Sequence, residues 1–357
     1  MIIAALVLII ICCMVWEQLS KRALRDALSM RLDFSGTEVC AGEETGFTEC
    51  VENRGAFPAP LLEIGFRVEK GLSFPDAENF AESDFVYKRD VFSLLGHERI
   101  VRKYRVRCLR RGHYTLSKAQ IRFLTLPFRT TLVKEAETGG DLYVYARRTD
   151  VRDILLQLEA LLGENASARR LFEDPFSFAQ IRDYTTRDPM KTINWKASAR
   201  SGALKVNTYT SVQSEQVIVY LDPSDTKIRK EPELVEECIS VAAGICRALL
   251  SKGLECTLVI GDDVLGPGRG SAFGCGIERS LTGDFSDVPF RLPALRPEAE
   301  LSGDKIPVWI TKNARQEDIR KLSAALEGRP ALVVSVESGD VPGPVSEGNI
   351  RVLRREV

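Results

Sequence analysis

The sequence is poor in the residue types that most often carry catalysis or bind metals. Its 357 residues include two histidines, His97 and His113, and its nine cysteines occur singly apart from Cys12-Cys13. Two histidines leave little basis for a Ser-His-Asp triad or a histidine-rich metal site. The cysteine spacings fit neither a zinc site nor a small disulfide framework. We therefore expect reduced thiols and a cytoplasmic location for the folded part.

An excess of charge of one sign is also lacking. The chain has 49 Lys and Arg against 50 Asp and Glu, a net charge of −1, and this balance excludes a global attraction to nucleic acid. The one strongly basic stretch, residues 99–111, has only Tyr104 as an interleaved aromatic residue, with Tyr114 just beyond it. We expect no nucleic-acid partner. A solvated strand face and a contact with anionic lipid headgroups both remain open for this stretch.

The sequence indicates no particular enzymatic reaction. The glycine-rich segment 266–270 contains Pro267 and lacks the Lys-Ser/Thr pair of a phosphate-binding loop. No base stands at a recognisable spacing from a cysteine or serine nucleophile. An enzymatic activity stays open, but a non-catalytic function is expected.

One long apolar run stands at the start of the chain. Residues 1–16 carry no charged side chain, and Lys21, Arg22 and Arg25 follow soon after Trp16. As a helix, sixteen residues span about 24 Å, somewhat less than the roughly 30 Å core of a bilayer. The run predicts a single transmembrane anchor over residues 1–20, with the main domains in the cytoplasm by the positive-inside rule. A terminal helix buried in a protein core is the alternative.

Residues 31–148 have the pattern of a β domain. Apolar and polar residues alternate in several short segments that are separated by turn-forming residues, and this alternation is typical of half-buried strands. The apolar members are Leu62, Ile64, Phe66 and Val68, then Ala119, Ile121 and Phe123, then Leu142, Val144 and Ala146. The pattern predicts an immunoglobulin-like β-sandwich.

The rest of the chain has the alternating pattern of an α/β domain. Residues 149–214 begin with a predicted helix, Asp150–Leu162, that Gly163 is expected to end. From residue 215 to 357, strands and helices alternate, which predicts a mainly parallel sheet with helices on both faces. The expected elements are strands at Val217–Leu221, Cys256–Ile260, Pro307–Ile310 and Ala331–Val336, and helices at Pro232–Lys252, Gly276–Leu281 and Ala314–Leu326.

A dense motif lies between residues 182 and 204. Aromatic, charged and small residues follow one another in an order that neither a helix nor a strand pattern explains. The motif residues are Arg182, Tyr184, Asp188, Ile193, Trp195, Ser198, Ala199, Arg200 and Leu204, with Lys191 and Asn194 between them. In their order and spacing they resemble the hallmark of the bacterial DUF fifty-eight family. Arg187, Lys191 and Asn194 depart from it, because the family prefers Gly, Arg and Asp there.

This resemblance implies an architecture and a class of partner. The segments 53–58 and 110–114 match motifs found upstream in the same family. The implied architecture is an N-terminal transmembrane helix, an immunoglobulin-like β-sandwich and a Rossmann-type α/β domain similar to von Willebrand factor A domains. The implied partner is a MoxR-type AAA+ ATPase, together with other membrane proteins, in a chaperone-like or envelope-related assembly.

The hallmark residues have two possible roles. Lys191 and Arg200 could bind an anionic group of a partner or ligand, with Trp195 anchoring the segment by burial. Alternatively, Arg200 pairs with Asp188, which would tie the segment onto the sheet, and the segment is an architectural clamp between the sandwich and the α/β domain. The candidate residues for either role are Arg182, Tyr184, Asp188, Lys191, Asn194, Trp195, Ser198 and Arg200.

A second candidate site follows the first strand of the α/β domain. Asp222, Ser224 and Thr226 come directly after Leu221, where open α/β sheets place their ligands. In von Willebrand factor A domains an Asp-x-Ser-x-Ser loop at this place binds a divalent cation, and oxygen ligands suit Mg²⁺. Lys312 stands where another acidic residue would help, although Asp262 could contribute. The alternative is a turn in which Asp222 binds backbone N–H groups.

Three functional classes follow from these features. We expect a non-catalytic, membrane-anchored adaptor. A hydrolase that uses a metal held by Asp222 is the main alternative, and an extracellular adhesion module is another.

Overall fold

The computed structural model describes residues 2–75, 80–82, 85–124, 131–171, 178–185, 190, 193–209, 216–224, 231–285, 288, 305–338 and 344–357. The chain forms two compact units. Unit 1 combines Met1–Thr149 with Cys275–Asp287, and unit 2 combines Asp150–Gly274 with Val288–Val357.

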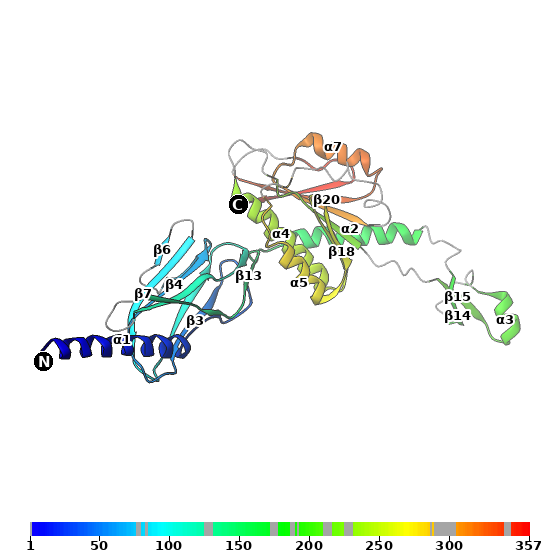
Figure 1. Ribbon diagram of the computed structural model, residues 1–357. Helices are drawn as coiled ribbons and strands as arrows, with labels where there is room; N and C mark the ends of the chain where they lie inside the picture. Colours follow the sequence, from blue (N-terminus) through cyan, green and yellow to red (C-terminus); the bar gives the residue numbers. More distant parts are fainter. Residues whose placement is uncertain are drawn as a thin grey trace. The chain divides into compact units, whose positions relative to one another are not determined.

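Unit 1 is a β-sandwich with a helix at its start, as the alternation of residues predicted (Figure 1). Its two large sheets have the strand orders β12-β1-β3-β8-β5 and β11-β10-β4-β7-β6, and a smaller sheet has the order β2-β13-β9. The strands of the first sheet are β1 (Leu28–Phe34), β3 (Glu44–Asn53), β5 (Leu72–Ser73), β8 (Arg99–Cys108) and β12 (Glu137–Thr138). Those of the second are β4 (Ala59–Glu69), β6 (Phe80–Glu82), β7 (Phe85–Leu94), β10 (Ser117–Leu124) and β11 (Thr131–Glu135). The small sheet consists of β2 (Glu38–Cys40), β9 (Gly112–Tyr114) and β13 (Leu142–Tyr145).

The core of unit 1 lies between the two large sheets. Phe47 of β3 is fully buried, and its ring centroid lies 5.2 Å from that of Phe66 in β4. Along β4, every second residue from Leu62 to Val68 is buried. Because side chains alternate across a strand, this one face is removed from water while the charged residues between stay accessible.

Helix α1 (Ile2–Ala27) is longer than the predicted anchor and has two different halves. Its second half packs on the sandwich, where Leu24 joins the core and Glu17 pairs with Lys21 at 2.9 Å. Its first half leaves the apolar side chains of residues 7–11 exposed in succession. Among the residues that the structure describes, no helix combines the length and apolarity needed to cross a membrane.

Residues 275–287 belong to unit 1, although the sequence suggested that they were part of the α/β domain. Helix α5 (Gly270–Ser280) ends in this segment. Arg279 binds Glu38 at 2.8 Å, and Arg111 donates to the carbonyl oxygens of Leu281 at 2.8 Å and Gly283 at 2.6 Å. These contacts hold the segment on the sandwich.

Unit 2 contains a six-stranded sheet of mixed direction with helices on both faces (Figure 1). The strand order is β18-β17-β16-β19-β20-β21, and every neighbouring pair is parallel except β17 and β18. The strands are β16 (Gln216–Leu221), β17 (Glu255–Ile260), β18 (Asp263–Gly268), β19 (Ile306–Thr311), β20 (Ala331–Glu337) and β21 (Ile350–Glu356). The helices are α2 (Arg152–Leu171), α4 (Pro232–Ser251) and α7 (Gln316–Ala325). Ile319 and Leu322 of α7 pack on the face that carries Ile218 and Trp309, whereas α4 covers the opposite face.

The structure corrects one sequence-based boundary in unit 2 and adds one strand. Helix α2 continues through Gly163 to Leu171 instead of ending there. Its surface is held by Arg351 of β21, which donates to Gln157 at 3.1 Å and to Glu164 at 2.6 Å. A glycine in a helix interior costs only about 1 kcal/mol, so these contacts on either side of Gly163 can maintain the helix. The strand β21 itself was not predicted.

Candidate functional site

The hallmark segment folds into a small unit of two strands and one short helix. Strand β14 (Phe178–Asp183) pairs antiparallel with β15 (Lys205–Tyr209), and helix α3 (Trp195–Ser201) lies between them in sequence. Ile193 is buried and makes a single β-bridge to Val206. The pair forms a sheet of its own, hydrogen-bonded to no other strand within the described ranges. The predicted packing of this segment against the large sheet stays a prediction.

Asn194 begins helix α3 by capping it. Its side-chain Oδ1 accepts a hydrogen bond from the backbone N–H of Ala197 at 2.9 Å. Its own backbone N–H donates to the carbonyl oxygen of Lys205 at 2.8 Å, which ties the start of the helix to β15. Asn and Asp are both strong N-cap residues because each offers a short side-chain oxygen. Asn194 therefore supplies the same kind of cap as an Asp would at this position.

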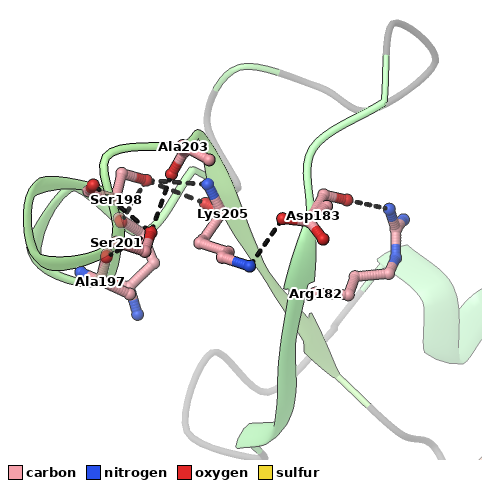
Figure 2. A network of polar contacts seen from close by, with 8 residues as sticks. Arg182, Asp183, Ala197, Ser198, Ser201, Ala203 and Lys205 are labelled. Atoms are coloured by element: carbon pink, nitrogen blue, oxygen red, sulfur yellow. Dashed lines mark hydrogen bonds and ion pairs between the residues drawn. The ribbon is translucent and has the colours of Figure 1, made fainter.

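Ser198 joins the helix to the strand a second time (Figure 2). Its buried hydroxyl donates to the carbonyl oxygen of Asn194 at 2.8 Å and accepts from the backbone N–H of Lys205 at 2.8 Å. At the edge of the unit, the ammonium of Lys205 binds the carboxylate of Asp183 at 2.6 Å, and Arg182 donates to the carbonyl oxygen of Asp183 at 3.0 Å. These contacts join α3 to the strands β14 and β15.

The exposed residues of this small unit are of several kinds, apolar, basic and acidic. Trp195 is 65% exposed, which contradicts the expectation that it anchors the segment by burial. Trp195 is the first residue of α3, directly after the capping residue, whereas Ile193 and Val206 are buried apolar residues of the unit. The other exposed residues of the unit include Ile181, Met190, Lys196, Arg200 and Leu204.

The structure thus separates the hallmark residues by role. Asn194 and Ser198 hold the local fold of the segment, whereas Trp195 and Arg200 are exposed. The clamp and the partner-binding interpretations both stay predictions. Arg182 and Tyr184 are half-buried in or next to β14, and the N–H of Tyr184 donates to the carbonyl oxygen of Leu204 at 2.9 Å. Asp188 and Lys191 lie outside the described residues, so the Arg200–Asp188 pair stays a prediction.

The second candidate site is at the carboxyl edge of the large sheet. Strand β16 lies in the middle of the sheet, with β17 on one side and β19 on the other. The chain leaves β16 for β17 and later returns to β19 on the opposite side, which makes the crevice between β16 and β19 the topological switch point. Asp222 follows β16, and its backbone N–H donates to the carbonyl oxygen of Ile310 in β19 at 2.9 Å. Its position is therefore the one that the sequence predicted.

Asp222 is only 5% exposed and is surrounded by hydrogen-bond donors. Its Oδ1 accepts from the hydroxyl of Ser224 at 2.5 Å and from the N–H of Ser224 at 3.1 Å, and its Oδ2 accepts from the hydroxyl of Thr311 at 2.6 Å. Asn313 completes the loop by donating to the carbonyl oxygen of Ser224 at 2.9 Å. Burial raises the pKa of Asp222, and the hydroxyls of Ser224 and Thr311 oppose that rise.

Oxygen ligands for a divalent cation are few here. Among the described residues of the network, Asp222 supplies the one carboxylate, and its two oxygens accept hydrogen bonds from the hydroxyls of Ser224 and Thr311. The side chain of Lys312 is fully buried, with its ammonium 3.8 Å from Glu231, so a positive charge already lies in the loop after β19. No group of three or more potential metal ligands of the His, Cys, Asp and Glu types occurs among the described residues.

The remaining predicted ligands do not add to this set. Asp262 is exposed and lies in the two-residue turn between β17 and β18, where Ile260 pairs with Asp263. Thr226 lies outside the described residues. The N–H of Ser224 donates a hydrogen bond to Oδ1 of Asp222, and this bond forms the kind of turn that was the alternative to a metal site. Magnesium binding stays a prediction that the described geometry does not favour.

Comparisons with known proteins give weak likenesses only. No protein-family model matches the chain, and no curated protein matches it. Among solved structures, a CARDB domain from Pyrococcus furiosus shares 17% identity, covers 33% of this chain and 91% of its own, and has a TM-score of 0.23. A non-cellulosomal cohesin from Archaeoglobus fulgidus shares 12% identity over 36% of this chain and 97% of its own, with a TM-score of 0.24. A type I cohesin from Pseudobacteroides cellulosolvens shares 13% identity, covers 35% of this chain and 96% of its own, and has a TM-score of 0.22. At such TM-scores nothing below rests on these likenesses.

Proposed function

We propose that this protein is a non-catalytic adaptor that is anchored in a membrane and docks a protein partner on helix α3. The exposure of Trp195 carries the proposal. Tryptophan and arginine are enriched among the residues that dominate interface energetics. Helix α3 offers Trp195 and Arg200 to solvent, and Asn194 and Ser198 join the helix to β15. A docking helix that is held in this way loses little conformational entropy on binding, which favours affinity.

The site at Asp222 supports a structural rather than a catalytic role. A general base or nucleophile needs an accessible carboxylate, whereas that of Asp222 is enclosed and fully hydrogen-bonded. By the family resemblance, we propose that the α/β unit serves as an interaction domain similar to von Willebrand factor A domains. By the family resemblance, the partner is a MoxR-type AAA+ ATPase that works with other membrane proteins in a chaperone-like or envelope-related assembly.

The membrane anchor is the first half of α1. A helix that is apolar on every side is typical of a segment surrounded by lipid. In α1, consecutive residues from Val7 to Ile11 are exposed and apolar, and Met14, Val15 and Trp16 continue the exposure. Lys21, Arg22 and Arg25 follow this stretch, and by the positive-inside rule they support the proposal that both units lie on the cytoplasmic side.

The docking proposal is tested by binding between the full chain in detergent micelles and the purified MoxR-type ATPase of the same organism. We expect Trp195→Ala to weaken binding at least about 30-fold, because loss of an interface hot spot costs roughly 2 kcal/mol. Leu156→Ala is the matched control, since Leu156 is 64% exposed on helix α2. Equal binding by the wild type and Trp195→Ala, or equal weakening by both variants, would overturn docking on α3. No binding by the wild type would overturn the identity of the partner.

A further inference from the structure

Two loops at one end of the β-sandwich are locked together by Asn53. Its buried side chain donates from Nδ2 to the carbonyl oxygens of Phe57 at 2.8 Å and Leu95 at 3.0 Å. Its Oδ1 accepts from the N–H of Gly55 at 3.0 Å. The N–H of His97 in turn donates to the carbonyl oxygen of Gly55 at 3.0 Å. All the hydrogen-bonding groups of one buried amide therefore fix the loops 54–58 and 95–98 as a single platform.

This platform lies against α1 at the residue where the apolar run ends. The ring of Trp16 meets that of Phe57 edge to face, with centroids 5.3 Å apart. Leu95 is 66% exposed on the second loop, and Trp16 is 50% exposed. Aromatic and apolar side chains thus gather beside the exit of α1 from the sandwich. We call Trp16, Phe57 and Leu95 the Trp16 end.

The length of the apolar run determines how deep this end would lie in a membrane. Sixteen residues give about 24 Å of helix, whereas the hydrocarbon core is about 30 Å thick. A span that is too short is accommodated by local thinning of the bilayer or by placing its flanking residues deeper in the interface. Trp16 closes the run, and tryptophan favours the headgroup region. Because Phe57 touches Trp16, the platform must lie at the same depth.

The Trp16 end also carries basic side chains. Arg22 is exposed within two turns of Trp16 along α1, whereas Lys21 pairs with Glu17 and the exposed Arg54 pairs with Glu52. Basic side chains near an anionic bilayer surface each contribute about 1 kcal/mol to association. Apolar residues flanked by basic ones are the pattern of an interfacial contact rather than of a solvated loop.

We propose that the Trp16 end of the β-sandwich lies in the headgroup region of the bilayer that α1 enters, with Leu95 and Phe57 in contact with lipid. The inference rests on the proposed membrane anchoring of α1 and extends it to the sandwich. It gives the sandwich a fixed orientation on the membrane, because the platform and the helix are joined by the contact between Trp16 and Phe57.

The test uses the full chain in vesicles of phosphatidylcholine and phosphatidylglycerol. The four cysteines that are not buried are first replaced, as Cys12→Ala, Cys13→Ala, Cys50→Ser and Cys275→Ser. Leu95→Cys is then labelled with an environment-sensitive fluorophore, and its quenching by brominated lipids is measured. Leu109→Cys is the matched control, since Leu109 is 57% exposed and follows the far end of β8. Ten strand residues separate the two positions by roughly 30 Å.

The expected result is a blue-shifted emission at position 95 and quenching several-fold stronger than at position 109. A chain that floats with vesicles after an alkaline wash, but is not quenched at position 95, would overturn the inference and leave the anchor standing. Equal quenching at both positions would also overturn it, because the sandwich would then contact lipid without a preferred end. A blue shift that depends on protein concentration and not on lipid would assign this end to a second copy of the chain. A chain that does not float would refute the anchor itself.

Discussion

The hydroxyl of Thr311 donates to Oδ2 of Asp222 over 2.6 Å, and this bond joins the carboxyl ends of two neighbouring parallel strands. Asp222 follows β16 and Thr311 ends β19, so the bond closes the switch point of the sheet. The same hydroxyl accepts from the N–H of Asn313 at 3.0 Å, which orders the loop after β19. A crevice that binds ligands in many α/β proteins is here closed by the protein's own side chains.

Removing the Thr311 hydroxyl should destabilise unit 2. Thr311→Val keeps the shape of the side chain but leaves a buried carboxylate short of one donor. Hydrogen bonds to charged groups contribute about 1.5–3 kcal/mol, and we expect a loss of that size in the free energy of unfolding measured with urea. Thr311→Ser retains the donor and should cost clearly less. Equal losses for the two variants would show that the methyl group, not the hydrogen bond, matters at this position.

The raised pKa of Asp222 predicts a pH-dependent stability. Burial makes the folded state bind the carboxyl proton more tightly than the unfolded state does. The contribution of Asp222 is therefore greatest below the usual aspartate pKa of about 4, and it decreases as the pH rises from there through the raised value. Asp222→Asn has no such titration. We expect the difference in unfolding free energy, wild type minus variant, to fall from acid to neutral pH in urea titrations. A difference that grows with pH would mean that the fold stabilises the charged carboxylate.

Capping of helix α3 by residue 194 should require a side-chain acceptor oxygen, whether or not that side chain is charged. Asn194→Ala removes the acceptor for the N–H of Ala197, and loss of an N-cap costs about 1 kcal/mol. We expect the amide of Ala197 to exchange with solvent about fivefold faster, measured by hydrogen exchange. Asn194→Asp keeps an acceptor oxygen and should exchange like the wild type. Fast exchange in both variants would contradict capping as the function of this side chain.

The platform held by Asn53 should be among the most sensitive points of unit 1. Asn53→Ala leaves two carbonyl oxygens and one N–H without their partner, and each buried group left unsatisfied costs about 1–3 kcal/mol. Partial hydration of the loops reduces the sum, so we expect a loss of about 3 kcal/mol in the free energy of unfolding. Arg54→Ala, which removes an exposed ion pair with Glu52 in the same loop, should change it by less than about 1 kcal/mol. Comparable losses in the two variants would refute the locking role of Asn53.

The strands of the sandwich could be predicted because a strand with one buried face shows an alternation of apolar and polar residues within its own sequence. Ile64 and Ile121 alternate with polar neighbours, and the structure buries both of them completely. The end of α2 could not be predicted in the same way, because Gly163 is a reasonable helix terminus until Arg351, far along the chain, binds on both sides of it. Strand β21 was missed because its residues are mostly charged and its pairing with β20 is the only reason for it to be extended.

The sequence by itself determined which segments bury an apolar face and where Asp222 leaves its strand, because these follow from local periodicity. Only the tertiary structure decided that Trp195 faces solvent, that residues 275–287 join the sandwich, and that Thr311 closes over Asp222. Each of these depends on residues distant in sequence coming within a few ångströms of one another, and no pattern along the chain contains that information.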